Sequence, residues 1–480
     1  MNICYRGERL PVNTAEVINM SDISSKKNTV DMTTGSATKH LLLFALPLFI
    51  GNLFQQFYNM VDSVIVGKFI NADALAATGS CGSLSFLFFS LSAGLAIGIG
   101  IIVAQYFGAG DERKIRETIA SSFYVLVISA LVVTAIGFIL ARPILKLLNT
   151  PEGPILEDAV VYLRTTVCGI LFIALYNGVS SVLRALGDSK TPLVFLIISS
   201  FLNVGMDLLL VIKFDMGVFG VALATVIAQA ISAFISLVYA FIKVPYFRLS
   251  KEELKPNRHI IMHSFRLGIP LAIQSSMIAI SLIVLQGVVN TFGHTAMSAF
   301  TITSKIDIVV SMFYNAISSA LTTFCGQNFG AKKYDRVKGG YKRGVLFMII
   351  YNIVIIPTVF FLSRQIVGFF VNEPEVIELG IKAVHITCFM YVALALIYVP
   401  RGTLNGVGDA NFSLINGITE VVCRVAFSFG LTMIPVIGQM GIWYATGLTW
   451  LFTAIICNIR YFSGVWYKKL PKPEENLQKG

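Results

Sequence analysis

Long apolar segments, separated by short polar ones, run along almost the whole chain. A helix of about 20 apolar residues crosses a bilayer, and twelve segments are close to or above that length. They lie at 42–66, 81–106, 118–140, 158–180, 192–213, 218–242, 261–290, 298–324, 344–362, 377–399, 412–434 and 438–462. The pattern predicts an all-α polytopic membrane protein with 12 transmembrane helices.

The N-terminal tail, residues 1–40, is polar and has no helical periodicity. It contains no apolar stretch typical of a signal peptide. Met32 directly precedes the run into the first span and is an alternative start, which would make residues 1–31 no part of the native protein. We therefore expect residues 1–31 to lie outside the fold.

The two halves of the chain repeat each other. AQYFGAGDERK at 104–114 aligns with GQNFGAKKYDR at 326–336, and LGD at 186–188 aligns with VGD at 407–409, with offsets of 221 or 222 residues. Each half has six spans, an even number, so both halves enter the membrane from the same side. We expect two six-helix bundles related by a pseudo-two-fold axis along the membrane normal, with a cavity between them.

The repeat also sets the domain boundaries. We expect an N-lobe at 41–242 with spans 1–6 and a C-lobe at 261–462 with spans 7–12. A basic linker at 243–260 joins them, and residues 463–480 form a second polar tail.

Charge is sparse, with 13% charged residues and a net charge of +11. If the N-terminus is cytoplasmic, the loops after even-numbered spans hold 18 Lys and Arg residues, Arg184 and Arg401 among them, against five in the opposite loops. Cytoplasmic loops carry the excess of Lys and Arg, so we expect both termini in the cytoplasm. This explains the positive charge without a nucleic-acid partner.

Motifs for enzyme chemistry are missing from the sequence. It has no nucleotide-binding P-loop, no catalytic triad and no His/Glu metal motif. The seven cysteines are scattered, mostly within apolar spans, and indicate buried thiols. We expect neither an enzyme nor a bound cofactor.

Two lone carboxylates lie within the spans of the first half, Asp62 and Asp207. Asn203 stands four residues before Asp207 and shares its helix face. With a rise of about 1.5 Å per residue, Asp207 lies about 22 Å into its span. A carboxylate at such depth is costly and is usually functional. We expect the two acids to meet and bind a coupling ion; the alternative is a structural role in capping or bonding helices.

The chemistry of this pair does not decide whether the coupling ion is Na⁺ or H⁺. Oxygen ligands suit a hard cation such as Na⁺. Two close carboxylates repel each other, which favours a proton on one of them near neutral pH.

Other charges within the spans form two groups. Glu420 and Arg424 are four residues apart on one helix and can pair, as a structural or gating contact. Lys305 and Asp307 are two residues apart and face different ways. Lys305 either faces the central cavity or reaches the outer interface.

Several motifs together resemble the MATE (multidrug and toxic compound extrusion) family of the MOP flippase superfamily. They are ALPLFIGNLFQQFYNMVDSVIVG (45–67), AQYFGAGD (104–111) with its second copy, LRALGDSKTP (183–192) and NVGMD (203–207). The resemblance covers about 42–462 and is to the N-lobe-carboxylate, prokaryotic DinF-like type.

The resemblance implies an ion- or proton-coupling site in the N-lobe. By motif its residues are Asp62, Tyr162, Asn203, Asp207 and Thr225. Na⁺ would be held by the two acids with Asn203 and Thr225. Some family members use acids in spans 7 and 10 of the other lobe, but span 7 of this chain has no acid.

The function implied is that of a secondary antiporter of the bacterial inner membrane. It would act as a monomer and export organic cations, drugs or amphiphiles in exchange for Na⁺ or H⁺ by alternating access. The alternative within the superfamily is a flippase for a lipid-linked saccharide, which needs a strongly cationic cavity. Cations within the spans are few, which argues against it: Arg164, Lys305, Lys382 and Arg424.

Overall fold

The computed structural model describes residues 29–147 and 150–468, which are almost entirely helical. The first half contains α2 (Ala37–Phe69), α3 (Ala72–Ala109), α4 (Glu112–Leu147), α5 (Pro154–Cys168), α6 (Ile170–Ala185), α7 (Lys190–Asp207), the π-helical segment η1 (Leu208–Lys213) and α8 (Gly217–Lys243). The second half contains η2 (Pro245–Phe247), α9 (Arg258–Asn290), α10 (His294–Gly330), α11 (Tyr334–Phe361), α12 (Ser363–Phe370), α13 (Pro374–Phe389), α14 (Tyr391–Gly406), α15 (Ala410–Thr432), η3 (Gly438–Met440), α16 (Gly441–Phe462) and α17 (Val465–Lys468).

Ten of these helices are long and apolar enough to cross a membrane, or up to 12 spans if each of two bent pairs counts as one. The bends measure 42° between α5 and α6 and 44° between α13 and α14. They fall at Gly169 and Met390, which are 221 residues apart, so the repeat extends to the breaks in the helices. The predicted all-α polytopic class is confirmed.

Several helices run beyond the apolar segments that predicted them. α3 extends over 72–109, and α11 begins at Tyr334, ten residues before its predicted span. A helix continues past the apolar region because its backbone hydrogen bonds are internal and need no bilayer. Polar caps begin some of these extensions: Asn71 Oδ1 accepts the amide N–H of Ala74 at 2.7 Å.

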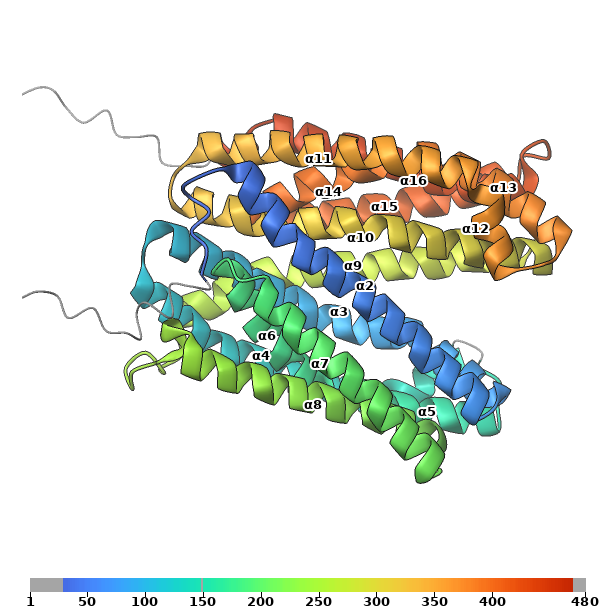
Figure 1. Ribbon diagram of the computed structural model, residues 1–480, viewed down its shortest axis with the longest axis horizontal. Coiled ribbons are helices and arrows are strands. Elements are labelled where there is room, and N and C mark those ends of the chain that lie inside the picture. Colours follow the sequence, from blue (N-terminus) through green and yellow to red (C-terminus); the bar gives the residue numbers. More distant parts are fainter. Residues whose placement is uncertain (1–28, 148–149, 469–480) are drawn as a thin grey trace, which may run out of the picture.

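The helices of each half gather into one bundle, and Figure 1 shows the two bundles side by side along their length. α2 crosses diagonally between them, packing on α7 of its own half and on α10 of the other. α9 does the same in reverse, packing on α3 of the first half and on α15 of its own. The first span of each half thus packs against a helix of the opposite half.

The halves approach most closely at the end of the molecule that we call the basic end. This end carries the connections at 110–111, 186–189 and 331–333 and the segment 248–257. Here α3 and α10 cross at two glycines in equivalent positions of the repeat. A Cβ on Gly108 would stand 1.8 Å from the carbonyl oxygen of Gln327, and one on Gly330 would stand 1.8 Å from that of Gln105.

Two glutamines complete this crossing with exchanged hydrogen bonds. Gln105 Nε2 donates to the carbonyl oxygen of Gly406 at 3.0 Å, and Gln327 Nε2 donates to that of Ala185 at 2.8 Å. Each glutamine caps the last turn of a helix in the other half, where carbonyls lack intrahelical partners. The symmetric exchange supports the predicted pseudo-two-fold relation.

The expectation that residues 1–31 lie outside the fold is wrong at Val30, which lies in the segment just before α2. The N–H of Val30 donates to the carbonyl oxygen of Leu186 in the first half at 3.2 Å. The N–H of Met32 donates to Gln327 Oε1 in the second half at 2.9 Å, and Met32 is 1% exposed. Val30 to Met32 therefore connect the halves at the basic end; residues 1–28 lie outside the described residues.

Arg336 on α11 holds this segment in place. Its guanidinium donates to the carbonyl oxygens of Met32, Thr34 and Gly35 at 2.9 to 3.0 Å. It also donates to Asn328 Oδ1 at 2.9 Å. Because these donors are charged, the bonds are stronger than neutral ones.

The first residues of the predicted C-terminal tail include a short helix. Residues 465–468 form α17, and Trp466 is buried with its ring stacked on Tyr461 of α16 at 5.9 Å. The remaining residues of the predicted tail, 469–480, lie outside the described part of the chain.

Gly108→Ala should destabilise the folded protein, because the added Cβ would overlap the backbone of Gln327. Overpacking costs about 1–3 kcal/mol even where neighbours can move. We expect a lower melting temperature of the detergent-solubilised protein, followed by tryptophan fluorescence. Gly430→Ala is the matched control, since its Cβ would meet nothing within 4 Å. An equal fall in both variants would contradict this account.

Arg336→Gln should release the segment before α2. A hydrogen bond to a charged group contributes about 1.5–3 kcal/mol, so cleavage by Asp-N protease at the Val30–Asp31 bond should accelerate at least about tenfold. Lys342→Gln, on the same helix and exposed, is the control. The measurement is mass spectrometry of timed digests, and unchanged cleavage at this bond would show that Arg336 does not hold the segment.

Candidate functional site

Asp62 and Asp207 lie together in the first half. Asp62 is on α2, and Asp207 is the last residue of α7, with 0% of its surface exposed. Their carboxyl groups are close enough to interact directly. As two carboxylates they repel; with one proton between them they can share a hydrogen bond.

The polar atoms of this site are left without protein partners. Within the described residues, Oδ1 of Asp62, Oδ1 of Asn203 and both carboxyl oxygens of Asp207 are buried and accept no hydrogen bond. Buried polar atoms are normally satisfied, and a cluster of orphaned acceptors needs an explanation. All four are oxygens, so a cation or a proton would satisfy them.

Asn203 and Thr225 are joined across two helices. Asn203 Nδ2 donates to Thr225 Oγ1 at 3.4 Å, and that hydroxyl donates to the carbonyl oxygen of Val221 at 3.2 Å. The contact ties α7 to α8 and uses the donor side of the amide, so its oxygen stays available. Tyr162 on α5 is half-buried and lies near Asp62. The structure therefore gathers all five residues named from the sequence into one region.

Tyr58 belongs to this region too and was missed in the sequence. It is on α2, four residues before Asp62, and lies close to both Asp62 and Asp207. The sequence contained the information needed to identify Tyr58, because a spacing of four residues puts Tyr58 and Asp62 on one helix face. The same spacing linked Asn203 to Asp207.

Apolar packing borders the site on one side. The π-helical segment η1 starts directly after Asp207, and such widened turns are frequent at functional sites. The cluster beside it, with Tyr162 packed against it, consists of Val66, Ala74, Val211, Val218 and Val221. A dry surrounding strengthens any charge interaction at the pair.

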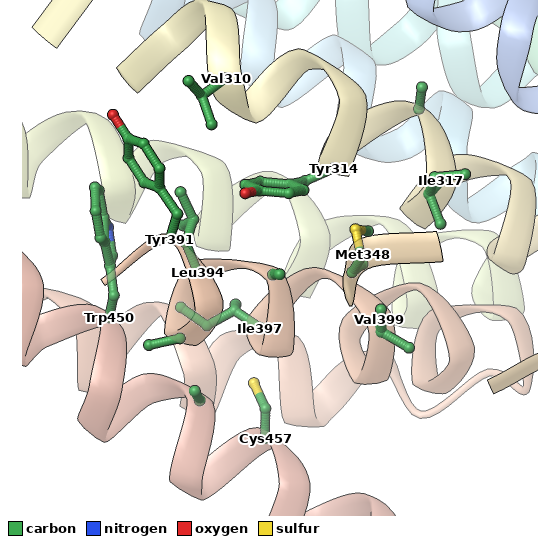
Figure 2. Packing of buried hydrophobic residues seen from close by; sticks show 14 of the residues in the cluster. Val310, Tyr314, Ile317, Met348, Tyr391, Leu394, Ile397, Val399, Trp450 and Cys457 are labelled. Carbon is green, nitrogen blue, oxygen red and sulfur yellow. The ribbon is translucent and has the colours of Figure 1, made fainter. Parts of the chain in front are cut away.

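A large cavity of about 1000 Å³ lies mainly in the second half, and Asp307 lines it. Asp307 Oδ1 accepts a hydrogen bond from Tyr391 Oη at 2.8 Å. Figure 2 shows Tyr391 and Trp450 side by side in the core of this half, with ring centres 6.2 Å apart. Packing of the Tyr391 ring beside Trp450 therefore fixes the position of the hydroxyl that donates to Asp307.

Glu420 and Arg424 lie in the wall of the same cavity, and both are buried. Arg424 Nη2 donates to Glu420 Oε1 at 2.9 Å, as the four-residue spacing suggested. Arg401 adds a longer contact, with its Nη2 3.8 Å from Glu420 Oε2. Lys305 is exposed, with its ammonium 5.6 Å from the ring centre of Phe370, and does not line the cavity.

The seventh span contains no acid. That span corresponds to α9, where Gln274 is buried and its Nε2 has no partner among the residues described. Glu378, on α13 in the tenth span, pairs with Arg364 of α12 and does not line the 1000 Å³ cavity.

Comparisons with known proteins agree with this architecture. The sequence profile of the MatE family matches residues 47–209 and 270–429. The chain is 29% identical over 438 residues to the probable multidrug resistance protein YpnP of Bacillus subtilis (strain 168), covering 91% of this chain and 97% of that protein. It is 26% identical over 442 residues to the probable multidrug resistance protein YoeA of the same organism, covering 90% and 95%.

Solved structures show the same fold. A MOP superfamily transporter from Pyrococcus furiosus Vc1 (DSM3638) superposes with a TM-score of 0.85 at 20% identity, covering 91% of this chain and 98% of that one. A structure described as the outward-facing conformation of a multidrug resistance MATE family transporter gives the same values. The family profile covers more than half of the chain, and the chain belongs to the MatE family of membrane transporters.

Proposed function

We propose that this protein is a secondary antiporter that exports organic cations and amphiphilic drugs in exchange for Na⁺ or H⁺. The observation that carries the proposal is the cluster of four buried, unpartnered oxygens at Asp62, Asn203 and Asp207. Such a cluster is stable when a cation or proton occupies it. The names of the Bacillus relatives, probable multidrug resistance proteins, support drugs as the cargo.

The coupling site would be of the N-lobe-carboxylate, DinF-like type. Asp62 and Asp207 supply its charge, Asn203 and Thr225 supply neutral oxygens, and Tyr162 borders it. The absence of an acid at Gln274 and its neighbours on α9 supports this assignment over one in the C-lobe. Either Na⁺ or H⁺ satisfies the same oxygens.

The alternating mechanism follows from where the site lies. Asp62 is on α2, which crosses from one bundle to the other, and Asp207 is on α7 of the first bundle. An ion between them offsets their repulsion and favours the arrangement in which α2 lies against α7. Loss of the ion favours their separation, and substrate binding then selects the other state.

The chain would reside in a bacterial inner membrane, with the basic end and both termini in the cytoplasm. Relatives from Bacillus subtilis support a bacterial membrane, and the excess of Lys and Arg at one end supports the orientation. One chain supplies both bundles and the 1000 Å³ cavity, which supports a monomer.

The alternative of a lipid-linked saccharide flippase would need a cavity dominated by cations. In the 1000 Å³ cavity, Arg401 and Arg424 face Glu420 and Asp307, so positive and negative side chains are equal in number. This balance argues against a lipid-linked saccharide site in the larger cavity.

Asp207→Asn should abolish coupled export while the protein remains folded and inserted. The amide keeps the size of the side chain and removes the negative charge to which a cation or proton binds. Asp62→Asn should do nearly the same, and the double variant should be little worse than either, because the two acids act as one site. The measurement is drug efflux from cells with surface expression, at several pH values and Na⁺ concentrations.

Asp73→Asn is the matched control for these variants, since Asp73 is exposed at the start of α3 and lies outside the site. It should export at the wild-type rate. Export against a gradient by Asp207→Asn at the wild-type rate would disprove N-lobe coupling. Coupling would then be sought around Asp307 or Glu420.

Tyr58→Phe should weaken coupling without abolishing it. The substitution removes one hydroxyl that lies beside both carboxyl groups and can interact with a Na⁺ ion or proton bound there. We take the contribution of a neutral hydrogen bond, about 0.5–1.5 kcal/mol, as the scale of that interaction. The Na⁺ or H⁺ concentration for half-maximal export should therefore rise about two- to tenfold. Tyr444→Phe, exposed in the second half, should leave it unchanged. No shift at position 58 would remove Tyr58 from the site.

A further inference from the structure

A second cavity, of about 490 Å³, lies between the two halves, and its lining reaches the basic end. Ala104, Ala185 and Thr322 are among the residues that line it. Ala104 directly precedes Gln105 of the glycine crossing, and Ala185 is the last residue of α6. The contacts at the basic end therefore lie between this cavity and the end of the molecule.

Residues 30–35, which we call the clasp, are fixed to the second half. The carbonyl oxygen of Met32 accepts a hydrogen bond from Arg336 Nη2 at 2.9 Å, and that of Thr33 accepts one from Lys333 Nζ at 3.0 Å. Met32 and Thr33 are both buried. Hydrogen bonds from cationic donors are stronger than neutral ones, so these residues are held firmly at the start of α11.

The clasp also meets the first half, at the turn that follows α6. The N–H of Val30 donates to the carbonyl oxygen of Leu186 at 3.2 Å. The backbone of Val30 passes so close to Gly187 that a Cβ on this glycine would stand 2.3 Å from the carbonyl oxygen of Val30. Val30 therefore connects the clasp to the first bundle.

Gln327 on α10 joins the clasp to both halves. Its Oε1 accepts the N–H of Met32 at 2.9 Å, and its Nε2 donates to the carbonyl oxygen of Ala185 at 2.8 Å. One side chain thus uses its acceptor for the clasp and its donor for α6. If the halves part at the basic end, the clasp stays on the second half, and the contacts with Ala185 and Leu186 break.

The equivalent turn of the second half forms without a clasp. Gly408 corresponds to Gly187 at an offset of 221 residues, and its φ is +85° against +89°. A Cβ on Gly408 would meet only the side chain of Gln105, at 3.2 Å, and Gly408 lines a cavity of about 260 Å³. The turn keeps its conformation with no backbone packed over it. The contact between Val30 and Leu186 is therefore not required to shape its turn.

We propose that residues 30–35 act as a conformational clasp, which holds the two halves together at the basic end and sets how readily this end opens. Arg336 and Lys333 keep the clasp on the second half, and its contact with Leu186 forms only when the basic end is closed. The clasp therefore stabilises the closed basic end relative to the open one. The inference rests on the alternating mechanism proposed above, in which this end opens in each cycle.

Labelling of a cysteine in the 490 Å³ cavity measures this opening. Ser319 lines the cavity and is half-buried, so Ser319→Cys supplies the reporter. Cys4, Cys168 and Cys423 are replaced by Ser, because the other four native cysteines are buried. A membrane-impermeant maleimide is added to inside-out membrane vesicles, in which the basic end faces the reagent. Lys251→Cys, exposed at the basic end, checks the orientation, and mass spectrometry follows the labelling rate.

Val30→Pro removes the N–H that binds Leu186 and should raise the labelling rate about two- to tenfold, as expected for the loss of one neutral hydrogen bond. The rate is proportional to the open fraction when reclosing is faster than labelling. Val30→Ala keeps the N–H and removes only part of an exposed side chain, so it is the matched control. It should be labelled at the wild-type rate.

Gly187→Ala tests the same contact from the first half. Its Cβ would overlap Val30 only while the basic end is closed, so labelling should accelerate at least about twofold. The positive φ disfavours alanine in the closed and the open state alike, and Gly408→Ala controls for this strain. The double variant with Val30→Pro should be little faster than Gly187→Ala alone, because both changes remove one contact.

The outcomes separate the clasp from the proposed mechanism. Labelling at the wild-type rate in both Val30→Pro and Gly187→Ala would overturn the clasp and leave the alternating mechanism standing. No labelling of the reporter cysteine in any variant would overturn both. The experiment needs no ion gradient, so its result does not depend on whether Asp207→Asn abolishes coupled export.

Discussion

The cost of an unpartnered charge in an apolar interior is the constraint on which this structure depends. Asp62 and Asp207 are brought together with no donor for three of their oxygens. Glu420, by contrast, is paired with Arg424. The proposed coupling ion would remove this cost, and its occupancy would then control the conformation.

The same reasoning connects the acid pair to the two cavities. The carboxylate of Asp307 accepts a hydrogen bond from one neutral donor, Tyr391. The guanidinium of Arg184 donates a hydrogen bond to a serine hydroxyl, that of Ser181. Each is a buried or half-buried charge whose partner is incomplete, and each lines a space that a substrate can enter. The acid pair lies in a separate region of the first half, so the proposed coupling ion and the substrate would act on the same equilibrium without sharing contacts.

Closure of the basic end rests on packing and hydrogen bonds rather than on ion pairs. Gly108 and Gly330 let two backbones meet, and Gln105 and Gln327 exchange bonds across the junction. Neutral hydrogen bonds each contribute modestly, so such a junction can open at moderate cost. The segment before α2, held by Arg336, adds a third connection that has no counterpart in the repeat.

The class of the protein, the positions of its spans and the parallel repeat could be read from the sequence, because apolar length and a constant offset are properties of a linear string. The acid pair could be inferred too, since intramembrane acids are rare. Only the tertiary structure decided what Arg184 and Arg401 face. The sequence placed both arginines in loops, but they lie in α6 and α14. These two helices continue beyond their apolar segments and end against the opposite half. Contacts across such a junction depend on how two bundles cross, and no local pattern encodes that crossing.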